Sequence, residues 1–193
     1  MLSMGFIDDI EVILSKLPTE RQTAFFSATM APPIRSLVNR FLKSPVTVTV
    51  DQVKAAPSKI QQQVYFIPRG WTKAQALQPI LELEQPESAI IFVRTRKAAA
   101  ELTNQLQSAG HSADEYHGDL TQTQRERLLA RFRGDKVRWI VATDIAARGL
   151  DVDHLSHVIN YDLPDSVENY IHRIGRTGRA GKEGVAISLI HSL

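Results

Sequence analysis

Cysteine is absent from the 193 residues of this chain, which excludes disulfide bonds and thiolate metal sites. The same absence is compatible with a reducing compartment, and we expect a cytoplasmic protein. No apolar run approaches the roughly 20 residues that a membrane-spanning helix needs, so we expect no membrane contact. The first residues lack a basic segment and soon reach Asp8 and Asp9, a pattern that is not typical of a signal peptide.

An excess of one charge is also lacking, because 23 Lys+Arg stand against 21 Asp+Glu for a formal net charge of +2. This excess does not by itself indicate nucleic-acid binding, so the local distribution of cations has to decide. Two sequence motifs that bind nucleotide phosphates and their Mg²⁺ are missing as well. The sequence has no G-x-x-x-x-G-K-[ST] loop to cradle a phosphate, and no run of carboxylates after a strand to hold Mg²⁺.

What the chain does have is a dense arginine cluster, His172-Arg173-Ile174-Gly175-Arg176-Thr177-Gly178-Arg179. Arg173 and Arg176 are three residues apart and would share one face of a helix. Arg176 and Arg179 are again three apart, across a glycine. Guanidinium forks suit phosphate recognition, and such a cluster is what the neutralisation of a transferring γ-phosphoryl group needs. A solvated basic helix end is the alternative.

The alternation of helical patterns with short apolar strands predicts an α/β domain with a mainly parallel sheet flanked by helices. We predict strands at 62–67, 89–93, 113–116, 138–142, 157–161 and 185–190. We predict helices at 72–84, 96–108, 122–133 and 166–174. Gly110 and Gly134 stand where helix C-caps are expected, and the pairs Thr121…Gln124 and Asp165…Glu168 have capping-box spacing.

The beginning of the chain differs from this series. Residues 6–17 and the segment from Pro32 onward have amphipathic helical patterns, residues 22–28 are predicted to form a buried strand, and residues 46–50 alternate as a strand. These elements cannot enclose a core, so residues 1–50 are expected to end another domain, followed by a linker at 51–59 and a complete domain at 60–193. Because the lone strand is a pairing hazard, we expect residues 1–45 to be mobile, packed on a second copy or exchanged between protomers.

Ligands of open parallel sheets bind beyond the carboxyl ends of the strands, and several polar residues stand there. Thr143 follows one predicted strand, where a hydroxyl and free backbone amides can hold a phosphate. Thr95 follows a second strand, and both threonines could instead cap the next helix. Gly118 follows a third strand, where it would let a nucleic-acid backbone approach closely or simply form a turn.

Further candidates lie near the same edge. Arg148 adds a guanidinium, and Asp151 is an acceptor suited to sugar hydroxyls. The predicted helix 122–133 carries four arginines, a face that fits a phosphate backbone or is merely solvated. Ser27-Ala28-Thr29 places two hydroxyls after the early strand, which is a weak signal because Ser and Thr often satisfy turns.

Taken together and in this order, these segments resemble the DEAD-box family of ATP-dependent RNA helicases, within superfamily 2. Residues 27–29 resemble its motif III, residues 89–95 motif IV, Gln124 with Arg127 the Gln-x-x-Arg motif, residues 142–151 motif V and residues 172–179 motif VI. The amino-acid sequences of these motifs are similar to those of bacterial members of the cold-induced type. The resemblance implies a C-terminal RecA-like lobe preceded by the tail of the N-terminal lobe, whose phosphate loop and Asp-Glu-Ala-Asp box the sequence lacks.

The resemblance also implies a role for each matching residue. Arg176 and Arg179 would be arginine fingers on the γ-phosphate, and Asp151 would bind the ATP ribose. His172, Ser27 and Thr29 would couple RNA binding to hydrolysis. Contacts to RNA, mainly through phosphate and sugar and therefore independent of sequence, would come from Thr95, Gly118, Arg127, Thr143 and Arg148.

The function implied by the resemblance is that of one half of an enzyme. ATP and Mg²⁺ would bind across the cleft with the N-terminal lobe, and closure on single-stranded or duplex RNA would separate a short duplex. We expect the chain by itself to have negligible ATPase activity. A DNA translocase lobe of superfamily 2 and a non-catalytic regulatory fragment that binds RNA or a partner are the alternatives.

Overall fold

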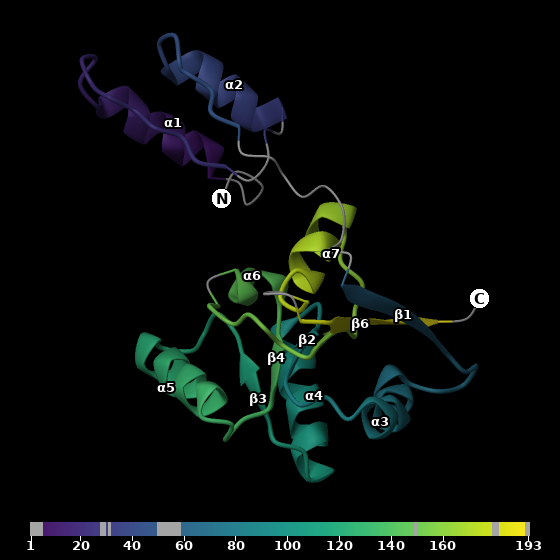
Figure 1. Ribbon diagram of the computed structural model, residues 1–193. Helices are drawn as coiled ribbons and strands as arrows, with labels where there is room; N and C mark the ends of the chain where they lie inside the picture. The colour runs from purple at the N-terminus through teal and green to yellow at the C-terminus, as the bar shows by residue number, and fades with distance from the viewer. Residues whose placement is uncertain are drawn as a thin grey trace. The chain divides into compact units, whose positions relative to one another are not determined.

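The computed structural model describes residues 6–27, 30, 32–49, 59–148, 150–178 and 182–191. The chain divides into two compact units, Met1–Gln52 and Val53–Leu193, and the second contains the whole sheet (Figure 1). No helix in the described part of the chain is long and apolar enough to cross a membrane.

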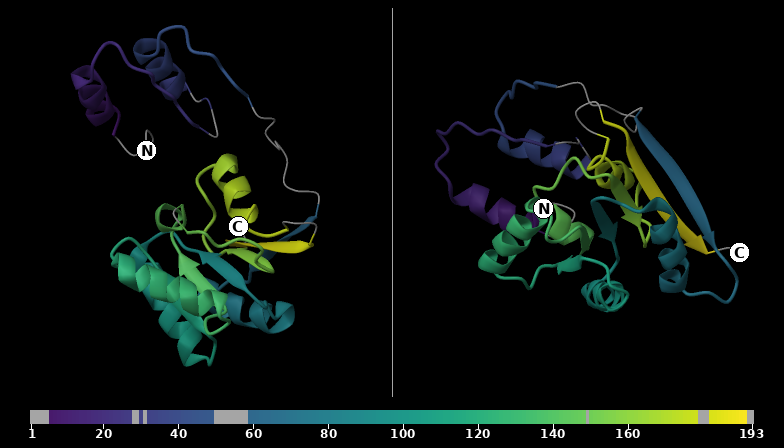
Figure 2. Two further views of the ribbon diagram at one scale, coloured as in Figure 1. Left: turned by 60° about the vertical axis from the view of Figure 1, so that its left-hand side comes forward. Right: turned by 60° about the horizontal axis from the view of Figure 1, so that its bottom comes forward.

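The larger unit is built on a six-stranded sheet in which every neighbouring pair is parallel. Its strands are β1 (Ile60–Ile67), β2 (Ala89–Phe92), β3 (Ala113–Tyr116), β4 (Trp139–Ala142), β5 (His157–Asn160) and β6 (Gly184–His191). Their order across the sheet is β1-β6-β5-β2-β4-β3, and the long strands β1 and β6 run side by side at one edge (Figure 2). The predicted fold class is confirmed, and each strand of this unit lies within two residues of its predicted position.

Helices cover both faces of the sheet, because successive side chains of a strand point to opposite faces. Ile91 and Val141 pack against α3 (Lys73–Glu84) and α4 (Arg96–Ser108). Ile90 and Ile140 lie in a second cluster with α5 (Gln122–Arg133) and α6 (Asp144–Ala147), and α7 (Val167–Ile174) covers the start of β1 and β6 on that face. The result is a three-layer domain, in which only the four-residue α6 was too short to be predicted from periodicity.

Helix caps fix most of the predicted boundaries. Thr121 and Gln124 form the predicted capping box at the start of α5. The predicted box Asp165…Glu168 is wrong: Ser166 takes the extended N-cap conformation, and its hydroxyl accepts a hydrogen bond from the Asn169 amide at the third helical position.

Helices α4 and α5 end close to the two glycines where C-caps are expected. Gly110 takes the left-handed conformation after α4, with φ of 86°, as its expected C-cap role requires. Gly134 is the C-cap of α5 with φ of −94°, whereas Asp135 is the residue that takes the left-handed conformation, with φ of 56°. Asp tolerates this region better than most residues because its short polar side chain bonds locally.

The smaller unit contains the two predicted helices, α1 (Ile7–Lys16) and α2 (Pro32–Phe41). Arg40 of α2 donates to Glu11 of α1 at 2.7 Å. Leu37 is the one buried apolar side chain that the structure describes here, while Phe26 is 94% exposed. The unit therefore has very little core of its own.

Neither strand predicted for the first unit is formed. Residues 22–27 and 46–49 belong to no strand, and residues 28 and 50 lie outside the described ranges. Strand propensity is not sufficient, because a strand also needs a neighbour that accepts its backbone hydrogen bonds, and no described strand pairs with either segment. The self-association of residues 1–45 and the proposed domain limits stay predictions.

A buried histidine at the start of β5 predicts that the stability of the larger unit depends on pH. Burial lowers the pKa of His157 below its ordinary value of 6.5, although the Glu84 and Glu87 carboxylates oppose the shift. Glu84 Oε2 lies 3.5 Å from Nε2, which makes no hydrogen bond to any described residue. Because the unfolded chain takes up a proton that the folded imidazole resists, we expect the free energy of unfolding to decrease as pH falls through about 6.5.

Urea unfolding between about pH 7.5 and about pH 5.5 measures this dependence. His157→Gln removes the titrating group and should flatten the change of stability over this interval. His191→Gln, at the exposed end of β6, is the control and should keep the wild-type slope. An unaltered slope in His157→Gln would contradict the assignment.

Candidate functional site

The predicted strand-end residues come together at the carboxyl edge of the sheet. The ladders align the ends of β2, β3 and β4, so the loops that follow them leave the sheet at one level. Thr95, Gly118 and Thr143 lie on these loops. The structure thus brings together three of the five residues predicted to contact RNA, although they are far apart in sequence.

The helix-capping alternative holds for one threonine and fails for the other. Thr95 is exposed, and its hydroxyl accepts a hydrogen bond from the Ala98 amide at 3.1 Å, which caps α4. Thr143 is largely buried at the start of α6, where its hydroxyl makes no capping bond. The side chain of Thr143 is therefore not committed to the helix end that it begins.

Gly118 is exposed, and the fold itself does not require a glycine there. A Cβ built at this position would meet no heavy atom within 4 Å, and its φ is not left-handed. Its carbonyl accepts from Arg125 Nη2 at 2.9 Å. The neighbouring Asp119 pairs with Arg96 at the start of α4, so an ion pair joins the loops after β2 and β3.

The predicted basic face of α5 is mostly occupied by contacts within the chain. Arg125 donates to the carbonyls of Gly118 and Leu120, Arg131 to Asp114, and Arg133 to Asp151. Arg127 is exposed and has no partner among the residues that the structure describes. Of the four arginines, Arg127 is therefore the one whose guanidinium is available to a phosphate.

A buried arginine organises the carboxyl edge. Arg173 of α7 is 3% exposed, and it donates to both carboxylate oxygens of Asp144 at 2.6 and 2.7 Å. It also donates to the Asn160 side chain at 3.0 Å and to the Asp162 carbonyl at 2.6 Å. Its guanidinium carbon lies 4.6 Å from the centre of the Phe92 ring. These contacts join α6, α7 and the ends of β2 and β5.

The common helix face predicted for Arg173 and Arg176 is wrong, because α7 ends at Ile174 and Gly175 is its C-cap. Arg176 instead lies in the turn that follows. Its guanidinium donates to the carbonyls of Ala147 at 2.7 Å and Leu150 at 2.8 Å. These bonds hold the connection between α6 and β5, which carries two predicted site residues.

The end of the arginine-rich octapeptide is fastened to the sheet. The Thr177 hydroxyl is fully buried and donates to the Leu155 carbonyl. Gly178 has φ of 65°, and a Cβ on it would lie 2.6 Å from a side-chain atom of Ile60. Both residues are therefore required by packing, whereas His172 is exposed and Arg179 lies outside the described residues.

The remaining predicted residues are placed separately. Arg148 is the exposed C-cap of α6, and Asp151 is exposed with its carboxylate 3.1 Å from Arg133 Nη2. Ser27 is an exposed residue of the smaller unit, and Thr29 falls outside the described part of the chain. In the regions that the structure describes, no group of three acidic or histidine side chains could hold a metal ion.

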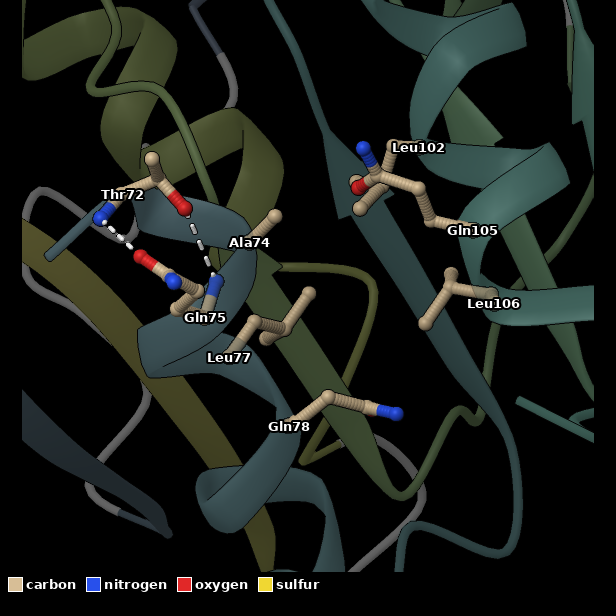
Figure 3. Close-up of a pocket in the computed structure, with 8 residues that line it drawn as sticks. All are labelled: Thr72, Ala74, Gln75, Leu77, Gln78, Leu102, Gln105 and Leu106. Atoms are coloured by element: carbon tan, nitrogen blue, oxygen red, sulfur yellow. Dashed lines mark hydrogen bonds between the residues drawn. The ribbon is translucent and has the colours of Figure 1, made fainter. Parts of the chain in front are cut away.

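A cavity of about 350 Å³ lies between α3 and α4 (Figure 3). It is lined by Thr72, Ala74, Gln75, Leu77, Gln78, Leu102, Gln105 and Leu106. None of these side chains is charged, and Thr72 and Gln75 already bond each other in a capping box. The cavity offers no counter-charge to a triphosphate, so it is not a candidate for the nucleotide.

Comparison with known proteins agrees with this geometry. Residues 72–181 match the helicase conserved C-terminal domain. The whole chain is 66% identical to the RNA helicase CrhR of Synechocystis sp., and it spans 39% of that protein. It is 38% identical to the crystal structure of a DEAD box protein from the hyperthermophile Methanococcus jannaschii, with a TM-score of 0.65 over 99% of this chain and 51% of that chain.

The chain belongs to the DEAD-box family. A second solved structure, S. cerevisiae Dbp5 bound to RNA and ADP BeF3, is 35% identical, with a TM-score of 0.79 over 96% of this chain and 49% of that chain. The predicted family and the RecA-like α/β fold of its C-terminal domain are confirmed. The chain spans well under two thirds of the length of CrhR, so it corresponds to part of a DEAD-box protein of that size.

The contribution of Arg173 to folding can be measured. Arg173→Ala leaves the buried Asn160 side chain and the one-third-exposed Asp144 carboxylate without their partner. The free energy of unfolding should therefore fall by about 3 kcal/mol. Arg131→Ala removes a half-exposed pair with Asp114 and should lower it by no more than about 1 kcal/mol. Urea unfolding of both variants checks this, and equal losses would show that Arg173 is not the organising group.

Proposed function

We propose that this chain is the C-terminal lobe of a cytoplasmic, ATP-dependent RNA helicase, which supplies arginine fingers for ATP hydrolysis and one wall of the RNA-binding cleft. The observation that carries the proposal is the shared edge. Thr95, Gly118 and Thr143 lie on three adjacent loops at the carboxyl ends of the strands, and the Arg173 contacts join that edge to the helix that leads into the arginine cluster.

We assign RNA backbone contacts to this edge because its groups suit phosphate and sugar. Thr143 and Thr95 offer hydroxyls and Gly118 offers close approach. Arg127 is exposed and pairs with none of the described residues, and Arg148 is exposed on the α6 connection. Contacts of this kind carry no base preference, which fits a helicase that acts on many single-stranded or duplex RNAs. That Dbp5 has been captured with RNA and ADP BeF3 supports the assignment by similarity.

We assign the nucleotide to the segment that follows α7. Arg176 and Arg179 are the proposed fingers on the γ-phosphate, and Asp151 is the proposed ribose ligand. The pair of Asp151 with Arg133 is mostly exposed and therefore weak enough to yield to a ribose hydroxyl. The Arg176 guanidinium donates to backbone carbonyls of Ala147, Leu150 and Val152, so contact with a phosphate requires it to give up part of these hydrogen bonds.

The partner of this lobe is the N-terminal RecA-like lobe of the same enzyme. We assign to that lobe the ligands of the Mg²⁺ that accompanies ATP, while the arginines of this chain neutralise charge on the transferring group. His172, which is exposed on α7, together with Ser27 and Thr29 would connect RNA binding with hydrolysis across the two lobes.

ATP hydrolysis tests the proposal. This chain alone should show no turnover with or without single-stranded RNA, whereas a chimera in which it replaces the matching segment of CrhR should be RNA-stimulated. Within the chimera, Arg179→Ala should lower kcat by about 10³-fold with little effect on RNA affinity, since a finger acts in the transition state. Lys182→Ala, an exposed cation close by in sequence, is the control.

Each contrary result has a definite meaning. Turnover by the chain alone would disprove the shared site. Equal stimulation of the chimera by DNA would favour a translocase, and RNA binding by a chimera without turnover would favour a regulatory fragment. Unchanged kcat in Arg179→Ala would remove the finger assignment.

Gly118 provides a separate prediction. Since a Cβ at this position meets nothing within the chain, Gly118→Ala should change the free energy of unfolding by less than about 0.5 kcal/mol. It should weaken RNA binding about tenfold, or about 1.4 kcal/mol, if a phosphate backbone approaches there.

Fluorescence anisotropy with single-stranded RNA and urea unfolding measure the two quantities for Gly118→Ala. Gly134 is the control at the far end of α5, where an added Cβ would lie 3.2 Å from the Ala130 carbonyl oxygen. Gly134→Ala should therefore lower the free energy of unfolding and leave the RNA affinity unchanged. RNA affinity that stays at the wild-type value in Gly118→Ala would contradict the contact.

A further inference from the structure

Asp162 is the meeting point of three elements, just after the end of β5. Its carboxylate accepts hydrogen bonds from Lys73 Nζ, at the start of α3, and from the backbone amide of Arg94 at 2.8 Å. Its own amide donates to the Phe92 carbonyl at 3.0 Å. Its carbonyl accepts from Arg173 Nη1 at 2.6 Å. The Asp162 side chain is 17% exposed, so hydrogen bonds to these partners take the place of most of its hydrogen bonds to water.

The charge of Asp162 is preserved by these bonds. Burial by itself would raise the pKa of its carboxyl group, but the hydrogen bonds from Lys73 and from the Arg94 amide outweigh it and hold the pKa below the ordinary value of 3.8. The group is therefore a carboxylate at neutral pH, and its bonds are of the stronger, charge-assisted kind.

The partners of Asp162 belong to the two halves of the candidate site. Arg94 directly precedes Thr95 in the loop after β2, and the bond from Asp162 uses the backbone amide, which fixes the path of that loop whatever side chain stands there. Arg173 belongs to α7, which leads into the arginine cluster. One short residue therefore touches the RNA-side loop with its carboxylate and the nucleotide-side helix with its carbonyl.

We infer that Asp162 is a positioning residue that couples α7 to the RNA-contacting loop at Arg94–Thr95. A displacement of α7 moves Arg173 and, through its bond, the Asp162 backbone. The Asp162 carboxylate then carries the Arg94 amide with it. The coupling passes through one residue and two hydrogen bonds between groups held in a packed sheet edge. This inference rests on the proposed function, because the loop and the helix are assigned there to RNA and ATP.

Amide hydrogen exchange tests the geometry without reference to activity. In Asp162→Ala the Arg94 amide loses its acceptor and should exchange at least about tenfold faster than in the wild type. The neighbouring Val93 amide donates to the Ala142 carbonyl at 3.0 Å and should be unaffected, which makes it an internal control. Asp162→Asn keeps a side-chain oxygen and should be intermediate. Equal exchange of Arg94 in wild type and Asp162→Ala would overturn the inference.

The coupling is measured in the chimera with CrhR, as the factor by which ADP BeF3 tightens the binding of single-stranded RNA. Asp162→Ala should reduce this factor about tenfold towards one, with RNA affinity in the absence of nucleotide changed by less than about threefold. A residue that merely stabilises the fold would lower stability without changing the ratio of the two affinities.

Asp114→Ala is the matched control, because Asp114 is also a partly buried carboxylate in an ion pair, with Arg131 at 2.7 Å, and lies on β3 before its end. It should keep the wild-type coupling factor. The same factor in Asp162→Ala and wild type would overturn the inference. A wild-type chimera that ADP BeF3 does not affect would count against the proposed function instead, while the exchange of the Arg94 amide would still decide whether Asp162 positions the loop.

Discussion

The carboxyl edge of this domain depends on one buried guanidinium. Arg173 satisfies the Asp144 carboxylate in α6 and, at the end of β5, the Asn160 side chain and the Asp162 carbonyl. Its guanidinium also lies over the Phe92 ring. A buried charge is tolerated only when its donors are paired, so the segments must all be in place together. A lysine could not do this, because its single ammonium lacks the planar fork that bonds both oxygens of Asp144.

This constraint separates anchoring groups from contacting groups within the arginine-rich octapeptide. Arg173 and Thr177 face inward and fasten α7 to the sheet, and Gly178 is needed for close packing against β1. His172 is exposed. Arg176 has features of both groups. It is half-buried, and it donates hydrogen bonds to the α6–β5 connection that carries Asp151. Some side chains of the arginine-rich octapeptide therefore hold the carboxyl edge of the sheet together, while others are exposed at that edge.

The smaller unit shows the limit of local sequence preference. Helix α1 ends just before Pro18 and helix α2 begins at Pro32, as their amphipathic patterns predict. Both helices nevertheless bury little apolar surface. The apolar segment around Phe26 has the composition of a buried strand, but without a paired neighbour it forms none. A helix satisfies its backbone within one segment, whereas a strand depends on another part of the chain.

Three features could be predicted from the sequence: the alternation of strands and helices in the larger unit, the cap at Thr121 and the membership of the DEAD-box family. These follow from side-chain periodicity, from hydrogen bonds between near neighbours and from the order of motifs, all of which are local. Which charged side chains are paired among the described residues depends instead on the tertiary structure. It buried Arg173, paired three arginines of α5 and left Arg127 exposed. It also brought Lys73 and Arg94 to Asp162. Ion pairs form between groups that the fold brings close in space, and residues 89 positions apart carry no sign of such a pair in their spacing.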